Sequence, residues 1–285
     1  MVKMTKRVVS AIIMVLIFVP FLIMGGIPFT ILMAVLGVLG LYELLKIRGD
    51  VKKKFPVVMR LLAYLMTIFL IVNNANSIDL QYDLDYRLVS LIIFIFLAPM
   101  VFINNSKKYN LNDALFLVGS VVFIGLSFNL LTVIRNFNIA YIIYLFLITT
   151  MTDTFALFTG MLVGKHKLAP EISPKKTIEG SIGGTIIGTL VSFLVTLIPA
   201  MSLTNDNVFG LSLEWWMVLM LAFVMSLIAQ VGDLTFSAIK RHYGIKDYSQ
   251  VFPGHGGVLD RLDSILFNMI FFAVVMMIIA AGSIF

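Results

Sequence analysis

Residues 252–267, with the sequence FPGHGGVLDRLDSILF, place a histidine, three glycines, two aspartates and an arginine just before an apolar run. Glycines let a backbone approach an anion closely. A helix that begins near residue 258 presents unpaired N–H groups and the positive end of its dipole to the same place. His255 in this loop could donate to a phosphate or take part in proton transfer. The stretch therefore indicates a phosphate site at the start of a helix.

Two carboxylates follow on that helix. Asp260 and Asp263 are three residues apart and project from one helical face. Mg²⁺ prefers one or two protein carboxylates together with phosphate oxygens and water, so the pair suits a metal-bound phosphate. Acids in a first helical turn also complement the helix dipole, but this alternative leaves Arg261 and the HGG sequence unexplained.

Two further acids lie in apolar segments. Asp153 stands well inside an apolar run, where an ionisable group costs several kcal/mol unless it faces a partner or water. It either lines a polar or metal-binding cavity or makes a hydrogen bond between helices, helped by Thr150, Thr152 or Thr154. Asp233 lies near the end of a later apolar run, and no structural role visible in the sequence explains an acid at that position.

Cations accompany both acids along the chain. Lys175 and Lys176 belong to a proline-punctuated loop, and with Glu179 they precede the glycine-rich start of the next helix. These lysines could hold a phosphorylated ligand, or they could lie against anionic lipid head groups. Lys240 and Arg241 follow Asp233 at a helix end, where the macrodipole alone also favours cations.

The elements that must position these residues are membrane helices. The mean hydropathy is +1.03 and only 13% of the residues are charged. Backbone groups in lipid must be satisfied within each segment, so each apolar run of about 20 residues predicts a helix. We expect an all-α, polytopic integral membrane protein with about nine transmembrane helices. They lie near residues 8–25, 28–46, 57–73, 88–104, 113–134, 139–164, 181–201, 214–238 and 259–282.

The distribution of charge predicts the orientation of these helices. Nine spans place four basic segments on the side of the N-terminus, and by the positive-inside rule that side is cytoplasmic. The acidic segment 73–86 is expected outside. The candidate site then faces the cytoplasm. The basic segments are residues 46–54, 104–110, 164–176 and 240–257.

The composition excludes disulfides and thiolate metal ligands, and it does not indicate a zinc site. The chain has no cysteine, and its three histidines are too few and too scattered to suggest a zinc site.

Residues 1–135 are expected to be supporting transmembrane helices with possible dimer contacts, and residues 136–285 to form the catalytic transmembrane region. Glu43, in the first part, is expected to pair with Lys46 along its helix and is given no functional role.

A longer pattern resembles a known family. Ser237-Ala-Ile-Lys240-Arg241, then Lys246-Asp247, then Pro253 to Asp263 is similar to the signature of the phosphatidate cytidylyltransferases, also called CDP-diacylglycerol synthases. The segment from Asp153 through SPKKTIEG resembles that family's upstream motif. Leu157 and Met161 depart from it, because relatives usually carry a tyrosine and a cation at these positions.

The resemblance implies a reaction of CTP with phosphatidic acid that gives CDP-diacylglycerol and pyrophosphate. It also implies Mg²⁺ with K⁺ as a second ion, a homodimer, a site on the inner face of the cytoplasmic membrane, and no nucleic-acid partner. The implied metal ligands are Asp233, Asp260 and Asp263, which with Lys240 and Arg241 form the catalytic set. The implied substrate-binding residues are Asp153, Lys175, Lys176, Glu179, Lys246, His255, Gly256, Gly257 and Arg261.

Two alternatives stay open at this point. A CTP-dependent polyprenol or lipid kinase would share a membrane site for CTP but would release CDP instead of pyrophosphate. A secondary transporter also buries acids and glycine-broken helices near its substrate. The grouping of the motifs at one membrane face and the lack of an apparent inverted repeat favour an enzyme.

Overall fold

The computed structural model describes residues 2–51, 54–73, 75, 86–103, 105, 107–198, 201 and 213–282. The chain forms two compact units. Unit 1 contains Met1–Asn136 and Tyr243–Arg261, and unit 2 contains Phe137–His242 and Leu262–Phe285.

Long apolar helices dominate both units, and this confirms the all-α membrane architecture. Within the described residues, six helices are long and apolar enough to cross a membrane, and three apolar stretches are shorter. Most of the acidic segment 73–86 lies outside the described residues. The shorter stretches are Val9–Met24, Val57–Val72 and Arg87–Ile103.

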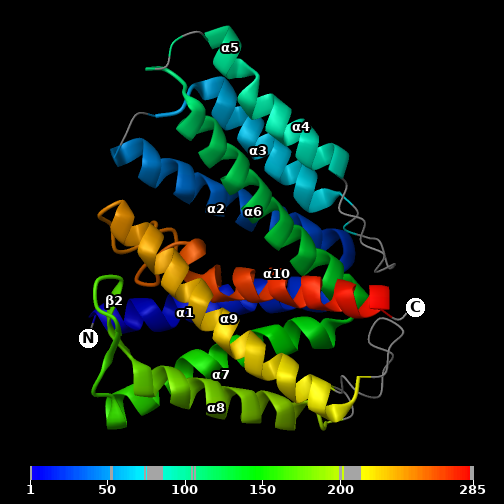
Figure 1. Ribbon diagram of the computed structural model, residues 1–285, viewed down its shortest axis with the longest axis vertical. Helices are drawn as coiled ribbons and strands as arrows, with labels where there is room; N and C mark the ends of the chain where they lie inside the picture. Colours follow the sequence, from blue (N-terminus) through cyan, green and yellow to red (C-terminus); the bar gives the residue numbers. More distant parts are fainter. Residues whose placement is uncertain are drawn as a thin grey trace. The chain divides into compact units, whose positions relative to one another are not determined.

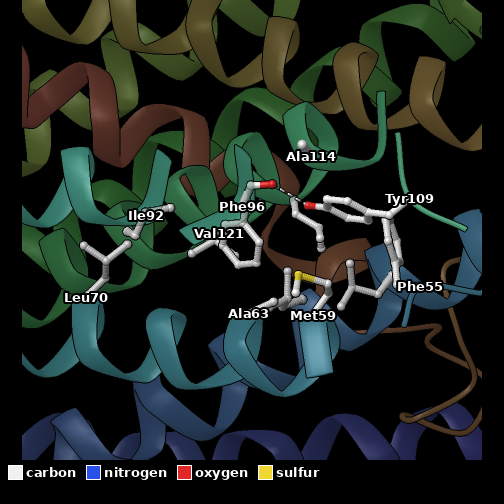
Figure 2. Close-up of a cluster of buried hydrophobic side chains, with 12 residues drawn as sticks. Phe55, Met59, Ala63, Leu70, Ile92, Phe96, Tyr109, Ala114 and Val121 are labelled. Carbon is white, nitrogen blue, oxygen red and sulfur yellow. Dashed lines mark hydrogen bonds between the residues drawn. The ribbon is translucent and has the colours of Figure 1, made fainter. Parts of the chain in front are cut away.

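Unit 1 is built from helices with a shared hydrophobic core. Its helices are α1 (Val2–Met24), α2 (Gly26–Val51), α3 (Val57–Val72), α4 (Tyr86–Leu97), α5 (Pro99–Ile103) and α6 (Leu111–Phe137). Figure 2 shows buried side chains of α3, α4 and α6 meeting around Phe96. The Tyr109 hydroxyl donates to the Phe96 carbonyl at 2.8 Å. Burial raises the pKa of Tyr109 to about 12, so this hydroxyl stays protonated and can donate.

A buried ion pair ties α2 to the start of α6. The guanidinium of Arg48 binds the Asp113 carboxylate, and only 4% of Arg48 is exposed. The same guanidinium lies over the ring of Phe55, 4.3 Å from its centre, and over Phe116 at 5.3 Å. The aromatic faces attract the cation and cover it from solvent, so the pair can exist inside the unit.

Helix α1 ends at Met24, just before Gly25, and Arg135 of α6 caps this end. Gly25 has a φ of 63°, a left-handed conformation typical of the residue after a helix. Arg135 donates to the carbonyls of Leu22 at 2.7 Å and Ile23 at 2.5 Å. A cation at this helix end satisfies carbonyls that have no partner within the helix.

Unit 2 begins with a pair of antiparallel helices, α7 (Ile139–Val163) and α8 (Ile178–Val195), which lie side by side in Figure 1. Asn138 caps α7 by accepting from the Ala140 N–H at 2.8 Å, and Thr177 caps α8 by accepting from the Gly180 N–H at 3.1 Å. Two short strands, β1 (Lys167–Ala169) and β2 (Ser173–Thr177), connect the helices. This hairpin is absent from the sequence-based prediction because it carries no alternating apolar pattern.

A glycine stripe brings α7 and α8 into close contact. Gly180, Gly184 and Gly188 recur every fourth residue, so they share one face of α8. A Cβ at residue 184 would lie 2.6 Å from the Cβ of Ala156, and one at residue 188 would lie 2.7 Å from the Thr152 hydroxyl. The two backbones therefore approach as closely as the missing side chains allow.

Polar bonds join α9 (Trp215–His242) to this pair of helices. Gln230 accepts from the Ser181 hydroxyl at 2.5 Å and donates to the Thr185 hydroxyl at 2.8 Å. The hydroxyls of Thr152 and Ser226 lie 2.8 Å apart. Hydrogen bonds of this kind fix the rotation of apolar helices against one another. The last helix, α10 (Leu259–Gly282), begins in unit 1 and continues into unit 2.

Candidate active site

The glycine-rich loop before α10 is a tight turn closed by its own backbone. The Phe252 N–H donates to the Gly256 carbonyl at 2.9 Å, and the Gly256 N–H donates back to Phe252 at 3.1 Å. Gly254 and Gly256 have φ values of 80° and 89°, which other residues rarely adopt. A Cβ at residue 256 would also lie 2.8 Å from the Asp260 carboxylate. Both backbone conformation and space therefore require glycine at residue 256.

Asp260 joins this loop to α10. Its Oδ2 accepts from the backbone N–H groups of Tyr248, at 2.8 Å, and Gly257, at 2.9 Å. The carboxylate thus connects Tyr248, before the loop, with Gly257 at its end. The sequence also predicts that Asp260 binds a metal ion.

The N–H groups of the first residue of α10 and of the two residues before it are already occupied by carboxylates. Gly257 donates to Asp260, and Val258 and Leu259 donate to Glu43 of α2 at 2.9 and 3.0 Å. The prediction that this helix start presents unpaired N–H groups to a phosphate is therefore wrong for these three residues. The chain's own acids take the place that the prediction gave to a ligand anion.

Glu43 is the residue that sequence reasoning missed. It was expected to pair with Lys46, but its carboxylate is fully buried and accepts from the Ser249 hydroxyl at 2.6 Å. It accepts from two backbone groups of α10 as well. The available signal was an acid within an apolar segment, the criterion that singled out Asp153.

The side chains of His255 and Arg261 both support the loop. His255 Nδ1 lies 2.6 Å from the Ser10 hydroxyl of α1, which also donates to the Pro253 carbonyl at 3.1 Å. Arg261 Nε donates to the carbonyl of His255 at 2.7 Å. The bond at Nδ1 orients the imidazole ring. Lys246, another predicted ligand residue, is exposed on the same unit.

A group of acids from three helices lies in unit 2. Asp153 of α7, Asp233 of α9 and Asp263 of α10 interact with one another electrostatically. Asp153 lies within an apolar helix, at the surface of the isolated chain. Because its charge interacts with Asp233 and Lys176 on other elements, its carboxylate belongs to a polar cluster of the unit.

Close packing of α9 against α10 brings two of these acids together. Gly232 precedes Asp233, and a Cβ at residue 232 would lie 3.1 Å from the Cα of Ser264, the residue after Asp263. It would lie 2.9 Å from the Cβ of Phe267 as well. The absence of a side chain at residue 232 therefore lets the two helices meet beside the two carboxylates.

Lysines from the same unit neutralise this acidic cluster. Lys176 of β2 forms an ion pair with Asp233 and interacts electrostatically with Asp153. Lys240 of α9 interacts with Asp263. Lys176 therefore belongs to the polar cluster of unit 2. Lys175, its neighbour, is exposed.

Two other predicted residues brace the β hairpin. Glu179 accepts from the backbone N–H of Lys165 at 3.0 Å, and its Oε1 lies 2.5 Å from His166 Nδ1. Arg241 Nε donates to the carbonyl of Ile172 at 3.2 Å. These bonds hold the hairpin that carries Lys176.

The acidic cluster suits Mg²⁺ by its chemistry. In the part of the chain that the structure describes, no three histidine, aspartate or glutamate side chains lie close enough to bind one ion by themselves. Mg²⁺ usually takes only one or two protein carboxylates and completes its octahedron with water and phosphate oxygens. Asp233 and Asp263, which interact electrostatically, are the two carboxylates that could supply such ligands.

Comparison with known sequences gives the family of the chain. Residues 5–279 match the cytidylyltransferase family. The chain belongs to this family. Curated relatives of this cytidylyltransferase family member include the phosphatidate cytidylyltransferases of Staphylococcus haemolyticus, Staphylococcus epidermidis and Staphylococcus saprophyticus. They are 34%, 35% and 33% identical over 264 residues, which cover 93% of this chain and 95% of each relative.

Two positions where this family member departs from the motif lie on α7. Leu157 is 61% exposed and Met161 is 64% exposed, so both apolar side chains lie on the surface of the isolated chain. Neither supplies a polar group to the acidic cluster.

Proposed function

We propose that the chain transfers CMP from CTP to phosphatidic acid and so forms CDP-diacylglycerol and pyrophosphate for phospholipid biosynthesis. The observation that carries this proposal is the extent of its similarity to proteins named phosphatidate cytidylyltransferase, which covers nearly the whole chain. The cations of unit 2, set among membrane helices, suit an anionic nucleotide and a lipid phosphate.

The reaction is an in-line displacement at phosphorus. An oxygen of the phosphatidic acid phosphate attacks the α-phosphorus of CTP, the new P–O bond forms, and the bond to the pyrophosphate leaving group breaks. A phosphate monoester has its second pKa at about 6, so the nucleophile is already ionised near neutral pH. No general base is required, and the aspartates are assigned to metal binding.

Repulsion between two anionic substrates is the main obstacle. Lys240 and Arg241 of α9, Lys246 and His255 are proposed to hold CTP phosphates. The N–H groups of Gly256 and Gly257 already bond to Phe252 and Asp260, so these glycines shape the loop instead. Lys176, held by Asp233, adds a further cation. Their charges favour the approach of the phosphate monoester.

We propose Asp233 and Asp263 as Mg²⁺ ligands, with Asp260 as the third predicted ligand and K⁺ as a second ion. Bound Mg²⁺ supplies charge neutralisation on phosphate oxygens and on the leaving pyrophosphate. The support from this chain is the close approach of α9 and α10 at Gly232, beside two of these acids.

We also propose that the protein lies in the bacterial inner membrane as a homodimer, with its N-terminus and site facing the cytoplasm. The support for the orientation is the placement of basic segments on one side of the predicted spans. The support for the membrane is the set of six long apolar helices.

Labelled CTP tests the reaction against the kinase alternative. Purified protein in detergent is incubated with phosphatidic acid, Mg²⁺ and CTP that carries ³²P at either the α or the γ position. Transfer of CMP moves only the α label into the lipid. If the γ label enters the lipid instead, the chain is a kinase, and if neither label does, the assigned reaction is wrong.

A further inference from the structure

A single buried carboxylate holds both ends of the segment 249–259. Glu43 Oε1 accepts from the Ser249 hydroxyl at 2.6 Å and from the Val258 N–H at 2.9 Å, and Oε2 accepts from the Leu259 N–H at 3.0 Å. Glu43 is 0% exposed. These bonds span more than 200 positions of sequence, and all of them lie within unit 1.

The surroundings of Glu43 leave little room for another arrangement. A Cβ at Gly257 would overlap the carboxylate, at 2.6 Å from its carboxyl carbon. One turn before Glu43, a Cβ at Gly40 would lie 3.1 Å from a methyl group of Leu259. Glycines on both sides therefore let α2 approach the first turn of α10 directly.

The bonds made by Glu43 satisfy a specific need of α10. The first N–H groups of a helix have no partner within the helix, and a negative charge at that end is stabilised by the dipole. Glu43 supplies both the acceptor and the charge from another helix. Val258 and Leu259 directly precede Asp260, so their position sets the position of that residue.

We propose that Glu43 is a positioning residue that fixes the glycine-rich loop and the first turn of α10 for the reaction. It acts through Ser249, Val258 and Leu259 and does not touch substrate. This inference rests on the proposed function for its kinetic consequence, whereas the position of the loop itself can be measured without turnover.

The kinetic experiment uses the isosteric variant Glu43→Gln. Its amide NH₂ group replaces one carboxylate oxygen and so places a donor against the backbone N–H of Val258 or Leu259. We expect the KM for CTP to rise about tenfold, because the loop carries His255, which is proposed to hold CTP, while the KM for phosphatidic acid changes by less than about twofold. A role in stability alone would lower the amount of active enzyme and leave both KM values unchanged. The matched control is Glu214→Gln, an exposed glutamate on unit 2.

A double-mutant cycle with Ser249→Ala tests whether the loop responds to this one carboxylate. Because Ser249 acts through Glu43, the two changes should affect the KM for CTP less than additively. Additive effects, or a KM for CTP within about twofold of wild type in the folded Glu43→Gln variant, would overturn the proposal.

Amide hydrogen exchange separates this proposal from the proposed function. In the full-length protein without substrate, residues 249–259 should exchange faster in Glu43→Gln than in wild type, and those of α8 should not. If wild type makes no CDP-diacylglycerol but the exchange difference appears, the reaction is wrong and the positioning stands. Equal exchange in both proteins would contradict the positioning.

Discussion

The glycine-rich loop of unit 1 and the acidic cluster of unit 2 are held in different ways. In the loop, Asp260 and Glu43 bind backbone N–H groups, and glycines fill places where a Cβ has no room. In the cluster, Asp153, Asp233 and Asp263 interact through charge, and Lys176 neutralises part of it. The loop depends on close fit and on hydrogen bonds to carboxylates, whereas the cluster depends on electrostatic balance.

This difference predicts which kinds of substitution disable each region. A change of charge with the same shape should disable the cluster, because the charge itself is what binds a cation. A change of shape without any charge should also disable the loop, because its glycines are packed against the carboxylates of Glu43 and Asp260. The predictions below test this contrast, beginning with the largest effect.

Asp263→Asn keeps the shape of the cluster and removes one charge. We expect turnover to fall about 10³-fold or more while the protein stays folded, because the proposed Mg²⁺ ligand is lost. Initial rates and a thermal melt measure the two effects. Asp50→Asn, at an exposed position of α2, is the matched control and should behave as wild type. Wild-type turnover in Asp263→Asn would remove Asp263 from the site.

Gly257→Ala adds one methyl group and no charge. The new Cβ overlaps Glu43, so the loop must shift, and a displacement of about 1 Å in a site can cost about 10²-fold in kcat/KM. Gly119→Ala, where a Cβ meets nothing within 4 Å, is the control and should retain full activity. Equal activity of the two variants would show that the shape of the loop is not limiting.

Lys176→Gln removes the cation paired with Asp233. The KM for CTP should rise about tenfold, because one charge that favours the nucleotide is lost and Asp233 is left without this partner. Lys167→Gln, at an exposed position of β1, serves as the control. An unchanged KM would mean that the ion pair has only a structural role.

Asp113→Asn should have the smallest kinetic effect. It breaks the buried pair with Arg48, which typically costs about 3–5 kcal/mol of stability, but it lies outside the loop contacts described above. We expect a lower melting temperature with both KM values unchanged. Replacing both partners, as Arg48→Met with Asp113→Leu, should recover much of the stability. A raised KM for CTP in Asp113→Asn would show that the loop is sensitive to the whole of unit 1.

The sequence predicts the membrane helices and most of the polar residues, because both follow from local patterns. Apolar runs, acids within them and the GHGG stretch are visible without any structure. The bonds from Ser10 and Glu43 to the loop are not visible, since they join helices at opposite ends of the chain and depend on tertiary packing. For the same reason, the sequence could not show that Glu43 already occupies the N–H groups expected to bind phosphate.

The β hairpin and the meeting of Asp233 with Asp263 also depend on packing. Three-residue and five-residue strands give too little periodicity to predict. Gly232 permits the contact of α9 with α10, but a single glycine in an apolar run gives no indication of its neighbour.

The most direct test of the account is the stoichiometry of products. Purified protein is given CTP, phosphatidic acid and Mg²⁺, and pyrophosphate and CDP-diacylglycerol are measured together, beside Asp263→Asn and a sample with chelated metal. The account predicts equal amounts of both products in the complete reaction and neither in the two controls. Release of CDP, or full activity in either control, would contradict it.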